Sequence, residues 1–265
     1  MKTNSVKSAL HEGKPQIGTW LSLFSPAAAR YMARVGFHWL TLDIEHSAAN
    51  WETAALIFGA IADAGGVPLA RVPANRPEYA KRALDAGAFG LIFPMICSAE
   101  EAGQAVAAAK YPPLGQRSVG GGMHALNFET TSAEYYQKAN DEILVAIQIE
   151  HISAVERCDD ILGVPGIDVA FVGPNDLLAS MGCRPAMDTD DPQFVEALRT
   201  VREAANRHHV APGIHVGDVE LAHKRLAEGW RFIAVASEQG LMLQKASETV
   251  KALIDDKDQA AARPY

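Results

Sequence analysis

The chain has 265 residues, of which 48% are hydrophobic and 21% charged, a composition typical of a globular protein with a large buried core. Its formal net charge of −8 disfavours nucleic acid as a partner, because a phosphate backbone binds to basic surfaces. No run of about 18 apolar residues predicts a membrane span, and residues 1–5 lack the apolar stretch of a signal peptide. We therefore expect one cytoplasmic domain that spans residues 1–265 and does not enter a membrane.

Short apolar segments alternate along the chain with longer segments of helical periodicity. The predicted strands are Gln16–Leu23, His38–His46, Val67–Val72, Gly90–Ile96, Ile143–Glu150, Asp168–Gly173, Ala211–Val216 and Arg231–Ser237. The predicted helices are Ala27–Val35, Trp51–Ala64, Pro77–Ala86, Ala99–Lys110, Ala154–Leu162, Pro192–His208, Val219–Glu228 and Leu241–Ile254. Because the strands are almost entirely apolar, this order predicts a parallel sheet covered by helices in an α/β fold.

Closure of this sheet gives a (β/α)8 barrel, or TIM barrel, and the length of the chain is close to that of one such barrel. The alternative is an open, doubly wound sheet. However, the turn after the first predicted strand, residues 23–26, lacks the Gly-x-Gly-x-x-Gly motif of dinucleotide-binding sheets. No Walker-type phosphate loop occurs either. The sequence therefore favours the barrel and predicts no nucleotide cofactor.

An irregular insertion, residues 112–141, interrupts the alternation between the fourth predicted helix and the fifth predicted strand. It begins with a glycine-rich part that ends at Gly122 and continues with His124 and Phe128. Long loops in compact domains are usually functional or disordered. We expect His124 either to bind a carboxylate of the substrate or to cap the loop.

Polar residues stand at the C-terminal ends of four predicted strands, where the active site of such a barrel lies. These residues are Asp43, Glu45 and His46 after the second strand, Arg71 after the third, Gln148 and Glu150 after the fifth, and Asn175 and Asp176 after the sixth. We expect their side chains to converge on one site at the mouth of the barrel.

Glu150 and Asp176 are hard oxygen ligands at neighbouring strand ends. Two carboxylates with several open positions suit an octahedral cation such as Mg²⁺ or Mn²⁺, which keeps water ligands and accepts substrate oxygens. The alternative is that Asp176 caps a helix, since Leu177 and Leu178 follow it. The joint position of the two carboxylates favours a metal site.

Arg71 follows an apolar run, so we expect its guanidinium group to meet a substrate carboxylate at the barrel mouth. An internal ion pair with Asp43 or Glu45 is the alternative. Histidine is the usual proton carrier in proteins near neutral pH, which makes His46 the natural proton carrier of this set. No lysine falls at the end of a predicted strand, which disfavours Schiff-base chemistry, so we expect a metal to take up electron density instead. No Gly-x-Ser-x-Gly motif predicts a serine hydrolase.

Several motifs of the chain resemble those of the class II pyruvate aldolases of the HpcH/HpaI family, the relatives of 4-hydroxy-2-oxoheptanedioate aldolase and 2-dehydro-3-deoxyglucarate aldolase. The resemblance covers residues 9–254 and is carried by Gly18–Leu21, Leu42–His46, Val72–Pro73, Tyr111–Arg117, Gln148–Glu150 and Phe171–Leu177. Ile44 stands where the family frequently has glycine, and Leu178 where it frequently has serine. The segment from Ser118 to His124 also differs from the family members that process dicarboxylates.

The resemblance implies a barrel whose last helix swaps onto a neighbouring copy, in a hexamer built as a trimer of dimers. It further implies Mg²⁺, Mn²⁺ or Co²⁺ bound by Glu150 and Asp176. By the same resemblance, Arg71 contacts the keto oxygen of the substrate, and His46 with Asp43 belongs to the catalytic base. Asp85 resembles a residue that reaches into a partner's site, although it could also be an exposed helical charge. The residues that we expect to contact the substrate are Trp20, Gln148, Gly122, Asn175 and His124.

The expected activity is the reversible cleavage of 4-hydroxy-2-oxo acids to pyruvate, or a related 2-oxo acid, and an aldehyde. Such a reaction belongs to the catabolism of aromatic compounds or sugar acids. A metal-dependent lyase or decarboxylase of the same superfamily, acting on oxaloacetate or a citramalyl-type thioester, is the alternative. A third interpretation is a barrel that only binds a small acid or serves as a scaffold, which predicts ligand binding without proton exchange.

Overall fold

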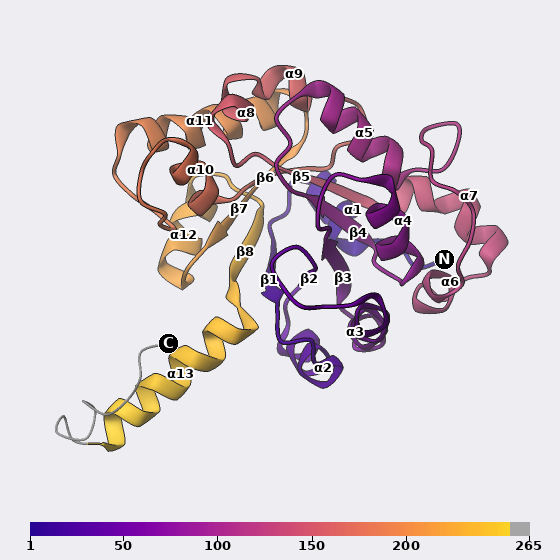
Figure 1. Cartoon of the computed structure of the whole chain (residues 1–265), viewed down its shortest axis with the longest axis horizontal. Coiled ribbons are helices and arrows are strands. Elements are labelled where there is room, and N and C mark those ends of the chain that lie inside the picture. The colour runs from indigo at the N-terminus through magenta and orange to yellow at the C-terminus, as the bar shows by residue number, and fades with distance from the viewer. Residues whose placement is uncertain (255–265) are drawn as a thin grey trace.

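A computed structural model describes residues 1–254 and shows eight parallel strands in a closed barrel surrounded by helices (Figure 1). Each strand pairs with the next one in the chain, and the first pairs with the last to close the ring. The strands are β1 (Gln16–Leu21), β2 (Trp39–Asp43), β3 (Val67–Arg71), β4 (Gly90–Phe93), β5 (Leu144–Gln148), β6 (Val169–Val172), β7 (Ala211–Val216) and β8 (Phe232–Ser237). The predicted (β/α)8 barrel is confirmed. Six of the strands end one to three residues before their predicted limits, where the chain already turns into the loops at the mouth of the barrel.

Six of the helices that cover the barrel are capped at their N-termini by polar side chains, namely Ser25, Asn50, Ser98, His151, Asp191 and Asp218. These helices are α2 (Pro26–Val35), α3 (Trp51–Asp63), α4 (Pro77–Asp85), α5 (Ala99–Ala109), α8 (Ile152–Glu156), α9 (Cys158–Leu162), α10 (Pro174–Ser180), α11 (Pro192–Arg207) and α12 (Val219–Ala227). The predicted helix Ala154–Leu162 is therefore two short helices, and α10 was not predicted. No described helix is both long and apolar enough to cross a membrane.

The prediction of an irregular insertion at residues 112–141 is wrong for its second half, which contains α6 (Met123–Asn127) and most of α7 (Ser132–Glu142). Aromatic packing orders this segment. Phe128 stacks on Phe89 with ring centroids 3.8 Å apart, and Tyr135 of α7 is fully buried. A further helix, α1 (Ser5–His11), precedes β1 and buries Val6 and Leu10.

Aromatic rings fill the interior of the barrel. Trp39 of β2 stacks on Phe232 of β8, with ring centroids 4.1 Å apart and an angle of 3° between the planes. Phe171 of β6 contacts both Phe232 and Trp20 edge-on, at 5.8 Å in each case. The stack is possible because β1 has a glycine beside it, since a Cβ atom on Gly18 would lie 2.1 Å from the ring of Trp39.

The last helix, α13 (Glu238–Leu253), leaves the barrel instead of covering it (Figure 1). Most of its residues are exposed, including the apolar Met242, Val250 and Leu253. A helix that presents apolar side chains to solvent has a surface available to another chain. The exchange of this helix between copies stays a prediction, because the structure describes one copy.

The substitution Gly18→Ala is expected to lower the free energy of unfolding by about 1–3 kcal/mol, because the buried Trp39 ring cannot move aside without losing its stacking on Phe232. Urea unfolding followed by circular dichroism measures this loss. Gly103→Ala in α5 is the matched control, since its added Cβ meets no atom within 4 Å and alanine favours a helix. Equal stability of the two variants would contradict the described packing.

Candidate active site

A cavity of about 270 Å³ opens at the C-terminal ends of the strands. Its wall comes from strands or loops all around the ring, which explains why residues far apart in the sequence meet there. The lining residues are Trp20, Ser22, Asp43, His46, Arg71, Gln148, Glu150, Phe171, Gly173, Pro174, Asn175, Asp176, His215 and Ser237. The structure thus brings together eight of the sequence-predicted site residues, namely Trp20, Asp43, His46, Arg71, Gln148, Glu150, Asn175 and Asp176. Their roles stay predictions.

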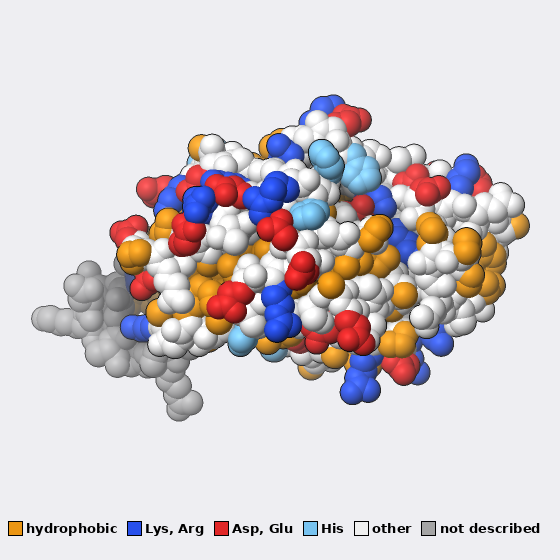
Figure 2. Space-filling model, turned by 90° about the horizontal axis from the view of Figure 1, so that it is seen from above, with side chains coloured by type: hydrophobic (Ala, Val, Ile, Leu, Met, Phe, Trp, Pro, Cys, Tyr) orange, Lys and Arg blue, Asp and Glu red, His pale blue; other side chains and the backbone are white. Residues whose placement is uncertain are grey.

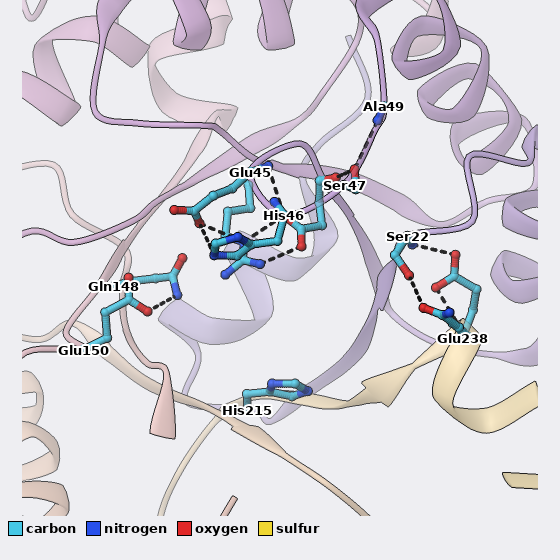
Figure 3. Close-up of polar contacts among 12 residues, drawn as sticks. Ser22, Glu45, His46, Ser47, Ala49, Gln148, Glu150, His215 and Glu238 are labelled. Atoms are coloured by element: carbon cyan, nitrogen blue, oxygen red, sulfur yellow. Dashed lines mark hydrogen bonds and ion pairs between the residues drawn. The ribbon is translucent and has the colours of Figure 1, made fainter. Parts of the chain in front are cut away.

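Glu150 is a carboxyl group buried directly after β5. Its Oε1 accepts a hydrogen bond from the backbone N–H of Met95 at 2.9 Å, and its Oε2 accepts one from Nε2 of Gln148 at 2.7 Å (Figure 3). Burial raises the pKa of Glu150 to about 7, and the nearby carboxylate of Asp176 also acts to raise it. A positive charge placed beside Glu150 would therefore favour its ionised form.

Asp176 lies in the first turn of α10 and is exposed. The N-cap of this helix is Gly173, and no side chain caps it, so the alternative that Asp176 is a helix cap is wrong. A Cβ atom on Gly173 would lie 2.5 Å from Oε2 of Glu150, which shows how closely the backbone before α10 approaches that carboxyl group. Glycine at this position keeps the two acidic side chains next to each other.

The residues around Glu150 fit a hard divalent cation. Oε1 of Gln148 is buried and has no hydrogen-bond partner among the described residues, and Asp176 supplies a second carboxylate. Within residues 1–254, no group of three or more His, Cys, Asp or Glu side chains is placed to hold a metal ion. A cation at Glu150 and Asp176 would thus keep open positions, as ions that bind water and substrate oxygens require.

Arg71 forms the ion pair that was the alternative expectation from the sequence. Its Nε donates to Oδ1 of Asp43 at 3.0 Å and its Nη2 to Oδ2 at 2.6 Å, while Glu45 lies 3.3 Å from Nε. Burial acts to lower the pKa of Arg71, but Asp43 and Glu45 raise it overall, so the guanidinium group stays charged. Nη1 has no hydrogen-bond partner among the described residues, and this donor is left for a ligand in the cavity.

His46 contacts Glu45 rather than Asp43. Its Nε2 lies 3.8 Å from Oε2 of Glu45, whereas only its backbone N–H donates to Oδ1 of Asp43, at 3.2 Å. The imidazole ring is 67% exposed, so solvent or another chain reaches it freely. Burial raises the pKa of Glu45. Asp43 thus holds the backbone of His46 in the single chain, and the role of the two residues in the catalytic base stays a prediction.

Asp85, Gly122 and His124 do not line this cavity. Asp85 accepts a hydrogen bond from Nη2 of Arg117 at 2.7 Å, and Arg117 also donates to the hydroxyl group of Tyr135. His124 is fully buried against Tyr135, with ring centroids 4.0 Å apart. Burial lowers the pKa of His124 to about 4, and neither ring nitrogen has a partner among the described residues. We call Asp85, Arg117, His124 and Tyr135 the Asp85 cluster.

Sequence reasoning missed two features of the cavity wall. His215 lies near the end of β7, where a polar residue in an otherwise apolar strand was the available signal. Glu238 begins α13 and is buried, and its Oε1 accepts the backbone N–H groups of Ser22 at 2.6 Å and Leu23 at 2.8 Å (Figure 3). Glu238 directly follows the eighth predicted strand, so the rule applied to the other strand ends was the available signal.

The surface seen from above carries basic and acidic side chains next to each other, with hydrophobic side chains between them (Figure 2). Some of these charges pair along helices, as Arg199 does with Glu196 and Glu203 on α11. Exposed pairs of this kind contribute little to stability.

Comparison with known proteins identifies the family of this barrel. The profile of the HpcH/HpaI aldolase/citrate lyase family matches residues 16–244. A 4-hydroxy-2-oxo-heptane-1,7-dioate aldolase from Shigella sonnei (strain Ss046) is 39% identical over 251 residues, which cover 94% of this chain and 94% of the relative.

Solved structures agree with the profile. The crystal structure of an HpcH/HpaI aldolase/citrate lyase family protein from Burkholderia cenocepacia J2315 is 36% identical and has a TM-score of 0.88, over 95% of this chain and 99% of that one. The citrate synthase SbnG is 27% identical with a TM-score of 0.84, over 98% of this chain and 100% of that one. The resemblance noted in the sequence motifs is confirmed, and the chain belongs to the HpcH/HpaI aldolase/citrate lyase family.

Proposed function

We propose that this protein is a divalent-metal-dependent aldolase that reversibly cleaves 4-hydroxy-2-oxo acids to pyruvate, or a related 2-oxo acid, and an aldehyde. The chain is a carbon–carbon lyase, since its family and its relatives are aldolases. The finer proposal rests on one observation, which is that the carboxyl groups of Glu150 and Asp176 line the same cavity as the charged Arg71. Relatives named for cleaving a 4-hydroxy-2-oxo dioic acid support the substrate class.

A divalent cation bound by Glu150 and Asp176 would supply Lewis acidity, which withdraws electron density from the 2-oxo group of the substrate. Gln148 holds the buried carboxyl group of Glu150 through its 2.7 Å hydrogen bond and so orients this ligand. Arg71 is fixed by Asp43 and donates from its unpaired Nη1 to the keto oxygen. Negative charge that develops on this oxygen is stabilised by a donor already in place.

Proton transfer is assigned to His46, which accepts a proton either directly or through a water molecule that it polarises. In cleavage, this group removes the proton of the 4-hydroxyl, and in the reverse direction it removes one from the 3-methyl carbon of the 2-oxo acid. Glu45 lies 3.8 Å from Nε2 of His46, close enough to pair with the ring once it carries the proton.

The proposal includes a homo-oligomer in which a neighbouring copy completes the site. Two observations support this arrangement, namely the 67% exposure of the His46 ring at the cavity and the exposed apolar side chains of α13. Asp85, which lies outside its own chain's cavity, is the residue proposed to face the neighbour's cavity. The proposed assembly is a hexamer made of three dimers, with α13 exchanged between copies.

Exchange of the methyl protons of pyruvate with deuterated water is expected to require the cation, since Lewis acidity makes the methyl group acidic enough to lose a proton. Proton NMR of pyruvate with the enzyme in Mn²⁺-free Mg²⁺ buffer, and again after chelation, measures this exchange. Restoration by added Mg²⁺ is the control for irreversible damage. Exchange that survives complete removal of metal would refute metal dependence.

Arg71→Ala is expected to slow this exchange by about 100-fold or more, because one preorganised donor to the developing charge is lost. Arg71→Lys should recover only part of the rate, since a single ammonium group cannot pair with Asp43 at two points while also donating to the substrate. Arg34→Ala on α2 is an exposed control outside the cavity. Wild-type exchange in Arg71→Ala protein with an intact circular dichroism spectrum would show that the assigned role is wrong.

The double substitution Glu150→Ala and Asp176→Ala is expected to abolish Mn²⁺ binding measured by titration calorimetry, because both proposed ligands are removed. The matched control replaces Glu52 and Asp63 by alanine, two exposed acidic residues of α3. The control removes the same formal charge and should leave Mn²⁺ affinity unchanged. Undiminished affinity in the double variant would place the cation elsewhere.

A further inference from the structure

We propose that His215 selects substrates that carry a hydroxyl group, by accepting a hydrogen bond from that hydroxyl inside the cavity. This inference rests on the proposed aldolase function and names the substrate class of the same site. The hydroxyl group can belong to the 2-oxo acid or to the aldehyde, and both sources present the same chemistry to His215.

The orientation of the His215 ring follows from a single contact. Its Nε2 lies 3.1 Å from the backbone carbonyl oxygen of Ala236 on β8. A carbonyl oxygen only accepts hydrogen bonds, so Nε2 carries a proton and donates it. The other nitrogen, Nδ1, has no hydrogen-bond partner among the described residues. It is also absent from the fully buried side-chain atoms that lack a partner, so it remains open to the cavity that the ring lines.

The charge state of the ring decides what Nδ1 can bind. Burial lowers the pKa of His215 to about 4, and Arg71 acts in the same direction. The ring is therefore neutral near neutral pH, with its proton on Nε2 and a lone pair on Nδ1. A neutral nitrogen of this kind accepts a hydrogen bond from a hydroxyl group, whereas a carboxylate offers it no proton.

The surroundings of His215 make this acceptor selective. The ring packs edge-on against Trp20, with centroids 5.8 Å apart, and Phe171 lines the same part of the cavity. Figure 3 shows His215 apart from the paired residues Glu45 and His46. When a substrate fills this space and excludes water, an acceptor that stays unpaired costs free energy. A substrate with a hydroxyl group opposite Nδ1 avoids this cost, so the site discriminates against the analogue that lacks it.

The experiment compares two pairs of reactants that differ by one hydroxyl group. In the first arm, 3-hydroxypyruvate and pyruvate each react with acetaldehyde, and in the second arm, glycolaldehyde and acetaldehyde each react with pyruvate. We expect the wild-type kcat/KM ratio to favour the hydroxylated reactant in one arm, which identifies the source of the hydroxyl. In His215→Leu protein, this ratio should fall by about 3- to 10-fold, mainly through KM, because one neutral hydrogen bond is lost. His215→Gln, which keeps a donor and an acceptor, should recover part of the ratio.

The control is His223→Leu, which replaces an exposed histidine of α12 and should leave both ratios at their wild-type values. A binding readout separates this inference from the proposed function. The ¹⁵N resonance of Nδ1 in His215 should shift when the preferred hydroxylated reactant binds and stay in place with its analogue, whether or not a carbon–carbon bond forms. Absence of this shift with both hydroxylated reactants, or ratios that are the same in wild-type and His215→Leu protein, would overturn the assignment. Failure of every reactant pair to give product, with the shift present, would instead count against the aldolase function alone.

Discussion

The burial of one carboxyl group, that of Glu150, is the constraint on which the cavity depends. The closed barrel places this side chain between the backbone of Met95 and the amide of Gln148, and solvent exclusion raises its pKa to about 7. The protein alone poorly stabilises the ionised form of a buried acid whose pKa is raised in this way. A bound cation would stabilise that ionised form by pairing with it. Gly173, for example, lets the backbone before Asp176 lie close to this carboxyl group.

The fold could be predicted because its signals are local and repeated. Each strand is a short apolar segment, most covering helices have their own period and cap, and the alternation of the two allows few topologies. Errors occurred where local signals were weak. The helices α6 and α7 are held by aromatic contacts such as that of Phe128 with Phe89, which join residues distant in the sequence. Propensity within a short window carries no information about such contacts.

The candidate site was predictable to the extent that its residues share one position, the C-terminal end of a strand. Asp43, Arg71, Glu150 and their neighbours follow that rule and line one cavity, which Trp20, expected only from the resemblance, also lines. Side-chain pairing was less accessible, since the two-point contact of Arg71 with Asp43 and the approach of Glu45 to His46 depend on rotamers. Gly122 and His124 were expected in the site because they belong to the insertion at residues 112–141, yet both lie outside the cavity, His124 in the Asp85 cluster. Whether a residue serves its own chain or a neighbour is not encoded in its spacing along the sequence.

The contact between the first and last strands of the barrel affects how the protein folds while it is synthesised on the ribosome. Glu238 holds the backbone of Ser22 across a separation of 216 residues, and β1 pairs with β8. Contacts between such distant residues form late, because the intervening chain must first be ordered. The cavity wall between β1 and β8 can therefore be completed only after nearly the whole chain has been translated. Until then, the nascent chain exposes the unpaired edges of β1 and of the last strand made, which are the surfaces that a chaperone would shield.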